Sequence, residues 1–267
     1  MMKIGFIGLG NMGGSLARLV AQDERYSSEL LLANRSRDKA EKIAAEVGGQ
    51  PVSNAEVFAQ AEVIFLGIKP AQFEGLLADY QEVLEERDSL LLVSMAAGLS
   101  LERLEKMTPS HHRWIRMMPN TPVAVGEGVI SYALSQQAHQ ADEDLFRELL
   151  SSAGLLVKLD EKQLDAATAL AGCGPAFVYL FIEALADAGV RAGLSRDVSL
   201  QLANQTLLGA AKLSQVSGQH PAQLKDQVCS PAGSTIAGVA SLEENAFRGT
   251  VMDAVQAAYK RTQELGK

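Results

Sequence analysis

The chain has 267 residues, enough for one large domain or two ordinary domains with a sizeable core. It carries a net charge of −8 and 47% hydrophobic residues, a balance that is typical of a soluble globular protein and unfavourable for a nucleic-acid or membrane-surface partner. Two cysteines, Cys173 and Cys229, form neither a disulfide framework nor a zinc pattern, and the four histidines have no metal-ligand spacing. We therefore expect a cytoplasmic protein with no metal site and no membrane span.

A glycine motif follows the first predicted strand. The apolar run at 3–7 predicts a buried strand, and Gly8, Gly10 and Gly13 follow it at the G-x-G-x-x-G spacing, before a helix predicted over 15–20. In this context Gly8 permits a tight turn, Gly10 lets the backbone approach a pyrophosphate, and Gly13 allows the helix to pack on the strand. The pattern indicates a dinucleotide site at a helix N-terminus. The simpler alternative is a tight strand-to-helix turn.

The end of the second predicted strand, 30–33, indicates which dinucleotide binds. An NAD site would carry an acidic residue here for the ribose 2′-hydroxyl, but the sequence reads Asn34-Arg35-Ser36-Arg37. Asn34 and Ser36 can donate hydrogen bonds, and Arg35 or Arg37 can pair with a 2′-phosphate. We therefore predict NADP(H) as the cofactor. The alternative is a solvated turn in which Ser36 caps the next helix.

The rest of the first 160 residues alternates between strands and helices. Helices are predicted at 38–47, 54–60 (with Asn54 as its N-cap), 70–86 and 141–152, and strands at 62–67, 89–94, 113–117, 128–133 and 155–159. Small residues at 95–98 follow one strand, and Pro119-Asn120-Thr121-Pro122 follows the next as a predicted extended, rigid loop. Since ligands bind at the carboxyl ends of parallel strands, both loops are candidate ligand contacts.

From Lys162 onward the sequence predicts helices and no strand. The helices are expected at 163–171, 175–192, 198–217, 221–228, 234–245 and 247–263. We therefore expect an α/β fold, with a Rossmann-type dinucleotide-binding domain over 1–160 and an all-α substrate and dimerisation domain over 161–267. The helix at 175–192 is apolar on most faces, so a subunit interface is expected, with burial inside one large monomer as the alternative.

A second glycine-containing break, at 229–235, separates two of these helices. Ser230, Ser234, Thr235 and several backbone N–H groups surround the predicted helix start. Such a cluster can hold a small carboxylate, or the hydroxyls can simply cap the helix; the sequence leaves both interpretations open. Cys173 and Cys229 are expected to have structural roles.

Six segments together resemble one family, the pyrroline-5-carboxylate reductases of proline biosynthesis. They are IGFIGLGNMG at 4–13, GIKP at 67–70, SMAAG at 94–98, RMMPNTP at 116–122, LAGCGPAF at 170–177 and HPAQLKDQVCSPAGSTIAG at 220–238. The resemblance implies reduction of the C=N bond of 1-pyrroline-5-carboxylate to L-proline by NADPH, with NADH as a weaker substitute. It also implies a homodimer formed through the helical domain, and assembly of five such dimers into a decamer.

The resemblance carries site residues over to this chain. In the cofactor site, the pyrophosphate would lie against Gly8, Leu9, Gly10, Asn11, Met12 and Gly13, the 2′-phosphate would meet Asn34, Arg35 and Ser36, the adenine would lie near Asn54, and the path to the nicotinamide would be lined by Ile68, Lys69, Pro70, Ala96, Ala97 and Gly98. The substrate would contact Asn120, Ser230, Gly233, Ser234 and Thr235, and Thr235 is the catalytic candidate, as a hydrogen-bond donor near the ring nitrogen. The family often has Gly-Gly-Thr-Thr where this chain has Ala-Gly-Ser-Thr. Ala232 therefore puts in doubt any backbone conformation with positive φ at that position.

Two rival functions share parts of this pattern. The β-hydroxyacid dehydrogenases open with the same glycine motif, but they place a catalytic lysine in the helix that corresponds to 175–192, and this helix has none. A redox-sensing protein could bind NADPH without turnover. The carboxylate-type loop at 230–235 argues against such a sensor, and a steady-state assay would separate the two.

Overall fold

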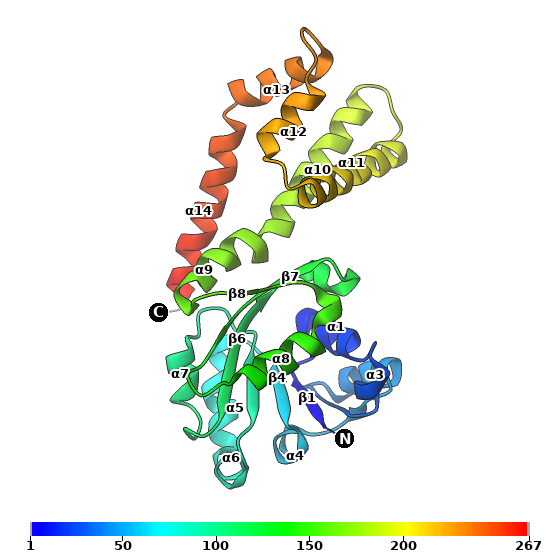
Figure 1. Ribbon diagram of the computed structural model, residues 1–267. Helices are drawn as coiled ribbons and strands as arrows, with labels where there is room; N and C mark the ends of the chain where they lie inside the picture. Colours follow the sequence, from blue (N-terminus) through cyan, green and yellow to red (C-terminus); the bar gives the residue numbers. More distant parts are fainter. Residues whose placement is uncertain (1, 266–267) are drawn as a thin grey trace. The chain divides into compact units, whose positions relative to one another are not determined.

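The computed structural model describes residues 2–265 and divides them into two compact units. Unit 1 comprises residues 2–173 and 258–265, and unit 2 comprises residues 174–257 (Figure 1). Helix α14 (Phe247–Leu265) starts in unit 2 and ends in unit 1.

Unit 1 is built on one eight-stranded sheet with the strand order β3-β2-β1-β4-β5-β6-β7-β8. Strands β1 to β6 run parallel, β7 is antiparallel to β6, and β8 is parallel to β7. The strands are β1 (Ile4–Ile7), β2 (Leu30–Ala33), β3 (Gln50–Pro51), β4 (Val63–Leu66), β5 (Leu91–Ser94), β6 (Arg113–Pro119), β7 (Gly128–Leu134) and β8 (Gly154–Lys158). All seven predicted strands are confirmed within two residues at each end. The two-residue β3 was not predicted, because a pair of residues has no periodicity to read.

Continuous apolar sequence explains why the central strands are buried on both faces. Every residue of β1, β2, β4 and β5 is buried, as a parallel sheet covered by helices requires. Side chains alternate between the faces, so that Phe6 and Phe65 on neighbouring strands stack with ring centroids 4.7 Å apart. Each fully buried side chain of this size stabilises the fold by roughly 1.5–3 kcal/mol.

Helices cover both faces of this sheet (Figure 1). One face packs against α1, α3 and α8, and the other against α4, α5, α6 and α7. The helical elements of unit 1 are α1 (Asn11–Val20), α2 (Glu24–Ser27), α3 (Arg37–Val47), α4 (Asn54–Gln60), η1 (Pro70–Gln72), α5 (Phe73–Asp79), α6 (Gln81–Glu86), α7 (Leu101–Glu105), η2 (Thr121–Val125), α8 (Gln140–Leu149), η3 (Ser151–Ala153), η4 (Glu161–Gln163), α9 (Leu164–Ala167) and the π-helix η5 (Thr168–Gly172). Short elements such as α2 and α7 were not predicted.

Three predicted helix boundaries were wrong, each for a local reason. Helix α1 begins at Asn11 instead of Ser15. Its first turns contain Gly13 and Gly14, and glycine has a low helix propensity, so the sequence did not indicate a helix there. Ser53, not Asn54, caps α4: its hydroxyl accepts from the Glu56 N–H at 3.2 Å, and the Glu56 carboxylate accepts from the Ser53 N–H at 2.8 Å. The helix predicted over 70–86 is interrupted at Tyr80, where φ is −119°.

The loop predicted as extended after β6 is partly helical. Pro119 ends β6 and Asn120 is extended, but η2 follows directly at Thr121 and closes on Gly126 with φ +74°. Pro122 lies at the start of this turn, where a fixed φ suits a helix as well as an extended chain.

Unit 2 is helical, and residues 162–265 contain no strand, as predicted. Its elements are α10 (Gly174–Arg191), α11 (Arg196–Ser217), α12 (Pro221–Val228), α13 (Ser234–Glu244) and the first part of α14. α10 packs against α11 (Figure 1), yet Val178, Tyr179 and Leu180 are 44–66% exposed. Among the described residues, these exposed side chains contradict the alternative that α10 is buried inside one monomer. Within the described residues, the helical stretch Glu161–Arg191 is long and apolar enough to cross a membrane by length and composition, and 11% of its 18-residue apolar window is buried.

Candidate active site

The glycine loop brings β1, β4 and α1 into backbone contact. Gly8 has φ +92°, a conformation that side chains disfavour, and a Cβ there would lie 2.6 Å from the Gly67 carbonyl oxygen. A Cβ on Gly13 would lie 2.1 Å from the Gly8 carbonyl oxygen. At Gly10, by contrast, a Cβ would meet no atom within 4 Å. Gly8 and Gly13 thus close the turn, while the space above Gly10 is open to a ligand.

The N-terminus of α1 has the properties of a pyrophosphate site. Gly10 is its N-cap, no side chain caps the helix, and no acidic residue lies in its first turn. The N–H groups of Asn11, Met12 and Gly13 have no intrahelical acceptor, and the first intrahelical bond runs from the Gly14 N–H to the Gly10 carbonyl at 2.9 Å. Open backbone donors and the positive end of the helix dipole fit a dinucleotide.

Asn34 braces the glycine loop from the end of β2. Its side-chain oxygen accepts from the Leu9 N–H at 3.0 Å, and its side-chain nitrogen donates to the Ser36 carbonyl at 3.1 Å. The sequence suggested Asn34 as a ligand contact, but it did not reveal this bracing role. This role depends on the pairing of strands in the folded chain. Because β1 and β2 are adjacent and parallel, the residues that follow them meet at one edge of the sheet.

Half of the predicted cofactor residues line one groove at the carboxyl edge of the sheet. We call it the nucleotide groove. Its lining residues are Ile7, Gly8, Gly10, Asn34, Arg35, Ser36, Asn54, Gly67, Ile68, Lys69, Gln72, Leu76 and Asp79. Leu9 and Gly13 are instead buried behind the loop, and Asn11 faces a second depression with Ser15, Lys39 and Lys42.

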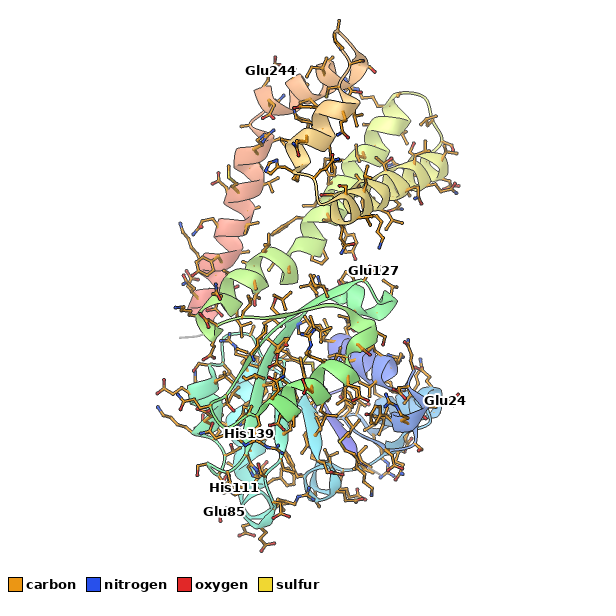
Figure 2. The ribbon with its side chains drawn as sticks, in the orientation of Figure 1. Glu24, Glu85, His111, Glu127, His139 and Glu244 are labelled. Carbon is orange, nitrogen blue, oxygen red and sulfur yellow. The ribbon has the colours of Figure 1, made fainter. Side chains whose placement is uncertain are left out.

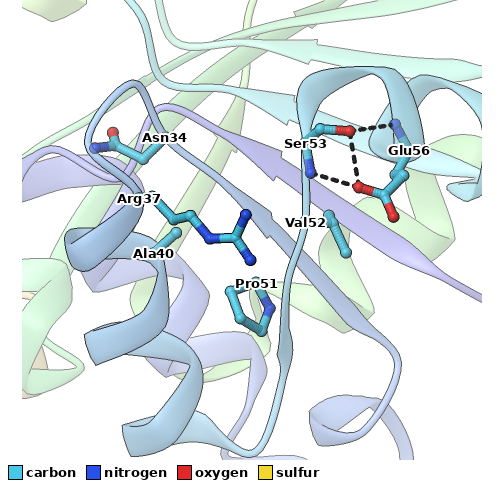
Figure 3. Close-up of a pocket in the computed structure, with 7 residues that line it drawn as sticks. All are labelled: Asn34, Arg37, Ala40, Pro51, Val52, Ser53 and Glu56. Atoms are coloured by element: carbon cyan, nitrogen blue, oxygen red, sulfur yellow. Dashed lines mark hydrogen bonds between the residues drawn. The ribbon is translucent and has the colours of Figure 1, made fainter.

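The two arginines that were candidates for the 2′-phosphate lie in different places. Arg35 lines the nucleotide groove. Arg37 lines a separate pocket, and its Nε atom is 2.9 Å from the Glu41 carboxylate. Figure 3 shows the Arg37 side chain extending toward Pro51 within that pocket. Ser36 occupies the N-cap position of α3 but makes no side-chain cap hydrogen bond, so helix capping does not use its hydroxyl.

The loop after β5 reaches the same edge of the sheet. Leu66 at the end of β4 pairs with Ser94 at the end of β5, and Gly67 and Met95 follow them. Ala96 is buried, its N–H donates to the Ser94 hydroxyl at 3.2 Å, and Gly98 has φ +80°. Ala96, Ala97, Gly98 and Pro70 do not line the groove itself; they continue this edge beside Ile68 and Lys69.

Asn120, a predicted substrate contact, is buried, and both polar atoms of its side chain hydrogen-bond to its own chain. Its side-chain oxygen accepts from the Val129 N–H at 2.8 Å, and its side-chain nitrogen donates to the Ala171 carbonyl at 3.0 Å. Its backbone N–H donates to the Val129 carbonyl, and its carbonyl accepts from Val123.

The predicted carboxylate loop lies in unit 2, between α12 and α13. Gly233 is the N-cap of α13 and no side chain caps this helix, so the hydroxyls at 230, 234 and 235 are not used for capping. The simpler interpretation from the sequence is therefore wrong. Ala232 does adopt the left-handed conformation, with φ +57°, and a Cβ on Gly233 would lie 2.3 Å from the Ser230 hydroxyl oxygen. The positive φ that the sequence put in doubt at Ala232 is therefore present, and the turn accommodates the methyl group of this residue.

The three histidines of unit 1, His111, His112 and His139, do not line the nucleotide groove. His111 precedes β6 and His139 precedes α8, and Figure 2 shows both at the end of unit 1 opposite Glu127, which precedes β7. His112 is buried: its Nδ1 accepts from the Leu90 N–H at 3.1 Å and its Nε2 lies 3.0 Å from the Leu84 carbonyl. Burial lowers the pKa of His112 to about 4. Within residues 2–265, no three His, Cys, Asp or Glu side chains are placed to hold a metal ion.

Comparison with known proteins adds two domain matches. Residues 161–265 match the model described as pyrroline-5-carboxylate reductase dimerisation. Residues 3–98 match the model described as NADP oxidoreductase coenzyme F420-dependent.

Full-length relatives and solved structures agree with these matches. The chain is 43% identical to a pyrroline-5-carboxylate reductase from Pisum sativum, covering 98% of this chain and 95% of that one. It is 41% identical to one from Synechocystis, covering 100% and 99%. It resembles the crystal structure of a Plasmodium falciparum pyrroline carboxylate reductase with NADP bound, with a TM-score of 0.88, 36% identity and coverage of 100% and 98%. The rival dehydrogenase would need a lysine in α10, which has none. The chain therefore belongs to the pyrroline-5-carboxylate reductase family.

Proposed function

We propose that this chain reduces the C=N bond of 1-pyrroline-5-carboxylate to L-proline with NADPH, the last step of proline biosynthesis. The observation that carries the proposal is that the chain has two helix starts at which no side chain caps the helix and which can each hold an anion. One is the open helix N-terminus at Gly10 in unit 1, and the other is the uncapped start of α13 at Gly233 in unit 2. The family membership of the whole chain supports the reaction.

The nucleotide groove is the proposed NADPH site. The glycine loop holds the pyrophosphate, and Asn34 keeps that loop in shape through Leu9. Arg35 and Ser36 hold the 2′-phosphate, because Arg35 lines the groove and the Ser36 hydroxyl does not cap α3. Asn54 and Lys69 line the groove around the adenosine half and toward the nicotinamide, with Ala96 to Gly98 beyond. When bound, NADPH supplies the hydride for the imine carbon.

The loop at 230–235 is the proposed carboxylate site. The free N–H groups at the start of α13 and the hydroxyls of Ser230 and Ser234 bind the substrate carboxylate. Gly233 leaves room for the Ser230 hydroxyl at this point. Asn120 was also predicted to bind substrate; its amide contacts lie within the chain, and its role is argued separately below.

Thr235 is the proposed catalytic residue. Reduction adds a hydride to carbon and a proton to the ring nitrogen, and the protonated imine is the better electrophile. A threonine hydroxyl is too weakly acidic to supply that proton alone, so Thr235 donates a hydrogen bond to the nitrogen, directly or through water, while water supplies the proton. Alignment of the two flat reactants provides most of the rate.

The assembly follows from the exposed faces of α10. The dimerisation match covers residues 161–265, so a second copy covers the apolar side chains that α10 exposes. We propose a homodimer through this region and five such dimers in a decamer. We also propose residues 1–160 as the NADP-binding domain, 161–267 as the substrate and oligomerisation domain, and the cytoplasm as the compartment.

The test is NADPH oxidation at 340 nm by the purified protein with 1-pyrroline-5-carboxylate, followed by chromatography for L-proline. Saturable oxidation with proline as the product is the expected result, and a parallel run with NADH measures the cofactor preference. NADPH binding without turnover would overturn the reductase proposal and would favour a nucleotide-sensing protein.

A further inference from the structure

We propose that Asn120 is a positioning residue, which clamps the π-helix η5 at the point where the chain leaves unit 1, and that it does not contact the substrate. The proposal rests on the proposed reductase function for its kinetic readout only. Its structural basis is the set of contacts that Asn120 makes inside unit 1.

The sequence creates a gap in the hydrogen bonding of the segment before α10. The carbonyl of Ala171 would normally accept from the N–H four residues later, but that residue is Pro175, which has no N–H. The segment also contains a π-helical turn, closed by the Cys173 N–H donating to the Thr168 carbonyl at 3.0 Å. An unpartnered carbonyl here would destabilise the turn.

Asn120 supplies the missing donor. Its side-chain nitrogen lies 3.0 Å from the Ala171 carbonyl oxygen, and its side-chain oxygen is fixed in turn by the Val129 N–H at 2.8 Å. Its backbone groups bond to β7 and η2. Asn120 therefore ties three segments together, and its 7% exposure leaves little of it for a ligand.

A second polar contact holds the other end of the same segment. Arg116, four residues earlier on β6, is buried and pairs with Glu161 at 3.1 Å and with Asp165 at 2.9 Å. Arg116 on β6 thus holds the start of the segment, and Asn120, the residue that follows β6, holds its end. The chain passes from unit 1 to unit 2 only two residues after Ala171.

This geometry predicts what the clamp does. Unit 2 carries the proposed carboxylate loop, and η5 is the last helical element of unit 1 before the chain enters unit 2. Loosening Ala171 should impair use of the imine substrate and leave NADPH binding unchanged, since Asn120 does not line the nucleotide groove.

The first test uses N120D, which keeps an acceptor for Val129, replaces the donor to Ala171 by an oxygen and adds a negative charge. The expected results are a fall of about tenfold in kcat/KM for the imine, an NADPH Kd within about twofold of wild type, and faster amide exchange over 164–172 by mass spectrometry. The matched control is Q50E. It makes the same change of amide to acid at an exposed side chain that bonds the Ser28 carbonyl at 3.5 Å, and it should behave as wild type.

The second test asks whether a backbone N–H can replace the side chain. P175A restores an N–H four residues after Ala171, the helical position from which its carbonyl would accept, so N120A/P175A should recover about half or more of the kcat/KM and exchange protection that N120A loses. If Asn120 contacted the substrate instead, N120D would raise the KM for the imine and leave amide exchange over 164–172 unchanged. P175A would then restore none of the kcat/KM that N120A loses. Either result overturns the clamp. If the wild type does not turn over, the reductase proposal fails, while the exchange measurements still decide the role of Asn120.

Discussion

The side-chain oxygen of Asn34 accepts a hydrogen bond of 3.0 Å from the N–H of Leu9, so the residue that follows β2 supports the glycine loop that follows β1. The same side chain donates to the Ser36 carbonyl. One amide therefore supports both the turn proposed to hold the 2′-phosphate and the loop proposed to hold the pyrophosphate. Loss of this amide should therefore affect both halves of the nucleotide site together.

Asn34→Asp tests this double role. The carboxylate can still accept from Leu9, but it cannot donate to the Ser36 carbonyl and it adds a negative charge beside the proposed 2′-phosphate. We expect the Kd for NADPH to rise about tenfold or more, and that for NADH to rise less, measured by quenching of the intrinsic fluorescence. Equal losses for both cofactors would show that Asn34 acts through the loop alone.

Arg35→Ala tests which arginine sets cofactor preference. Arg35 lines the nucleotide groove, and losing a charge-assisted bond to a phosphate costs about 1.5–3 kcal/mol. The KM for NADPH should rise about tenfold or more with little change for NADH, and the difference should shrink at high salt. Arg37→Ala is the control, because Arg37 pairs with Glu41 and lines a different pocket. A larger effect at Arg37 would reverse the assignment.

Thr235→Ala should lower kcat/KM for the imine by about one to two orders of magnitude, a loss of roughly 1–3 kcal/mol for one hydrogen bond. Thr235→Ser keeps the hydroxyl and should retain most of the activity. Steady-state kinetics at saturating NADPH measures both. Unchanged kinetics in Thr235→Ala would remove this residue from the mechanism.

Gly233→Ala and Ala232→Gly form a matched pair in the carboxylate loop. A methyl group on Gly233 would lie 2.3 Å from the Ser230 hydroxyl oxygen, so we expect KM for the imine to rise about tenfold. Ala232→Gly removes a methyl group from a residue with φ +57°, so relief of backbone strain and added chain entropy nearly offset. Its melting temperature and kinetics should stay close to wild type. The reverse ranking of the two variants would contradict the proposed carboxylate site.

His112 should make stability depend on pH. Burial lowers its folded-state pKa to about 4 from an ordinary value of 6.5, so the unfolded chain binds the proton more readily. The contribution of neutral His112 to the free energy of unfolding is complete above pH 6.5 and is lost as the pH falls toward 4. It amounts to about 2 kcal/mol between pH 7 and pH 5.

Urea unfolding at those two pH values measures the effect. His112→Asn removes the titration and keeps an acceptor for the Leu90 N–H, so its unfolding free energy should change less with pH, whatever its absolute stability. An equal pH dependence in wild type and variant would show that another group is responsible.

Elements whose signal lies in neighbouring residues could be predicted from the sequence. The apolar runs of the central strands, the glycine spacing at 8–13 and the absence of an acidic residue at 34–37 are all properties of adjacent residues. The apolar runs were sufficient to predict the sheet, and the other two patterns led us to predict a dinucleotide site and NADP(H) as the cofactor. The long helices after residue 174 were predicted for the same reason, while short elements such as β3 and η2 were not.

The partners of the polar side chains could not be predicted from the sequence, because they depend on the tertiary fold. Asn34 and Asn120 were both expected at a ligand, yet Asn34 also bonds to Leu9, 25 residues away, and Asn120 bonds to Ala171, 51 residues away. Arg35 and Arg37 are two positions apart in the sequence, but only Arg35 lines the nucleotide groove. An amide or a guanidinium has the same chemistry in every environment. Which partner it binds depends on the strands and turns that folding brings beside it, and no local pattern in the sequence records them.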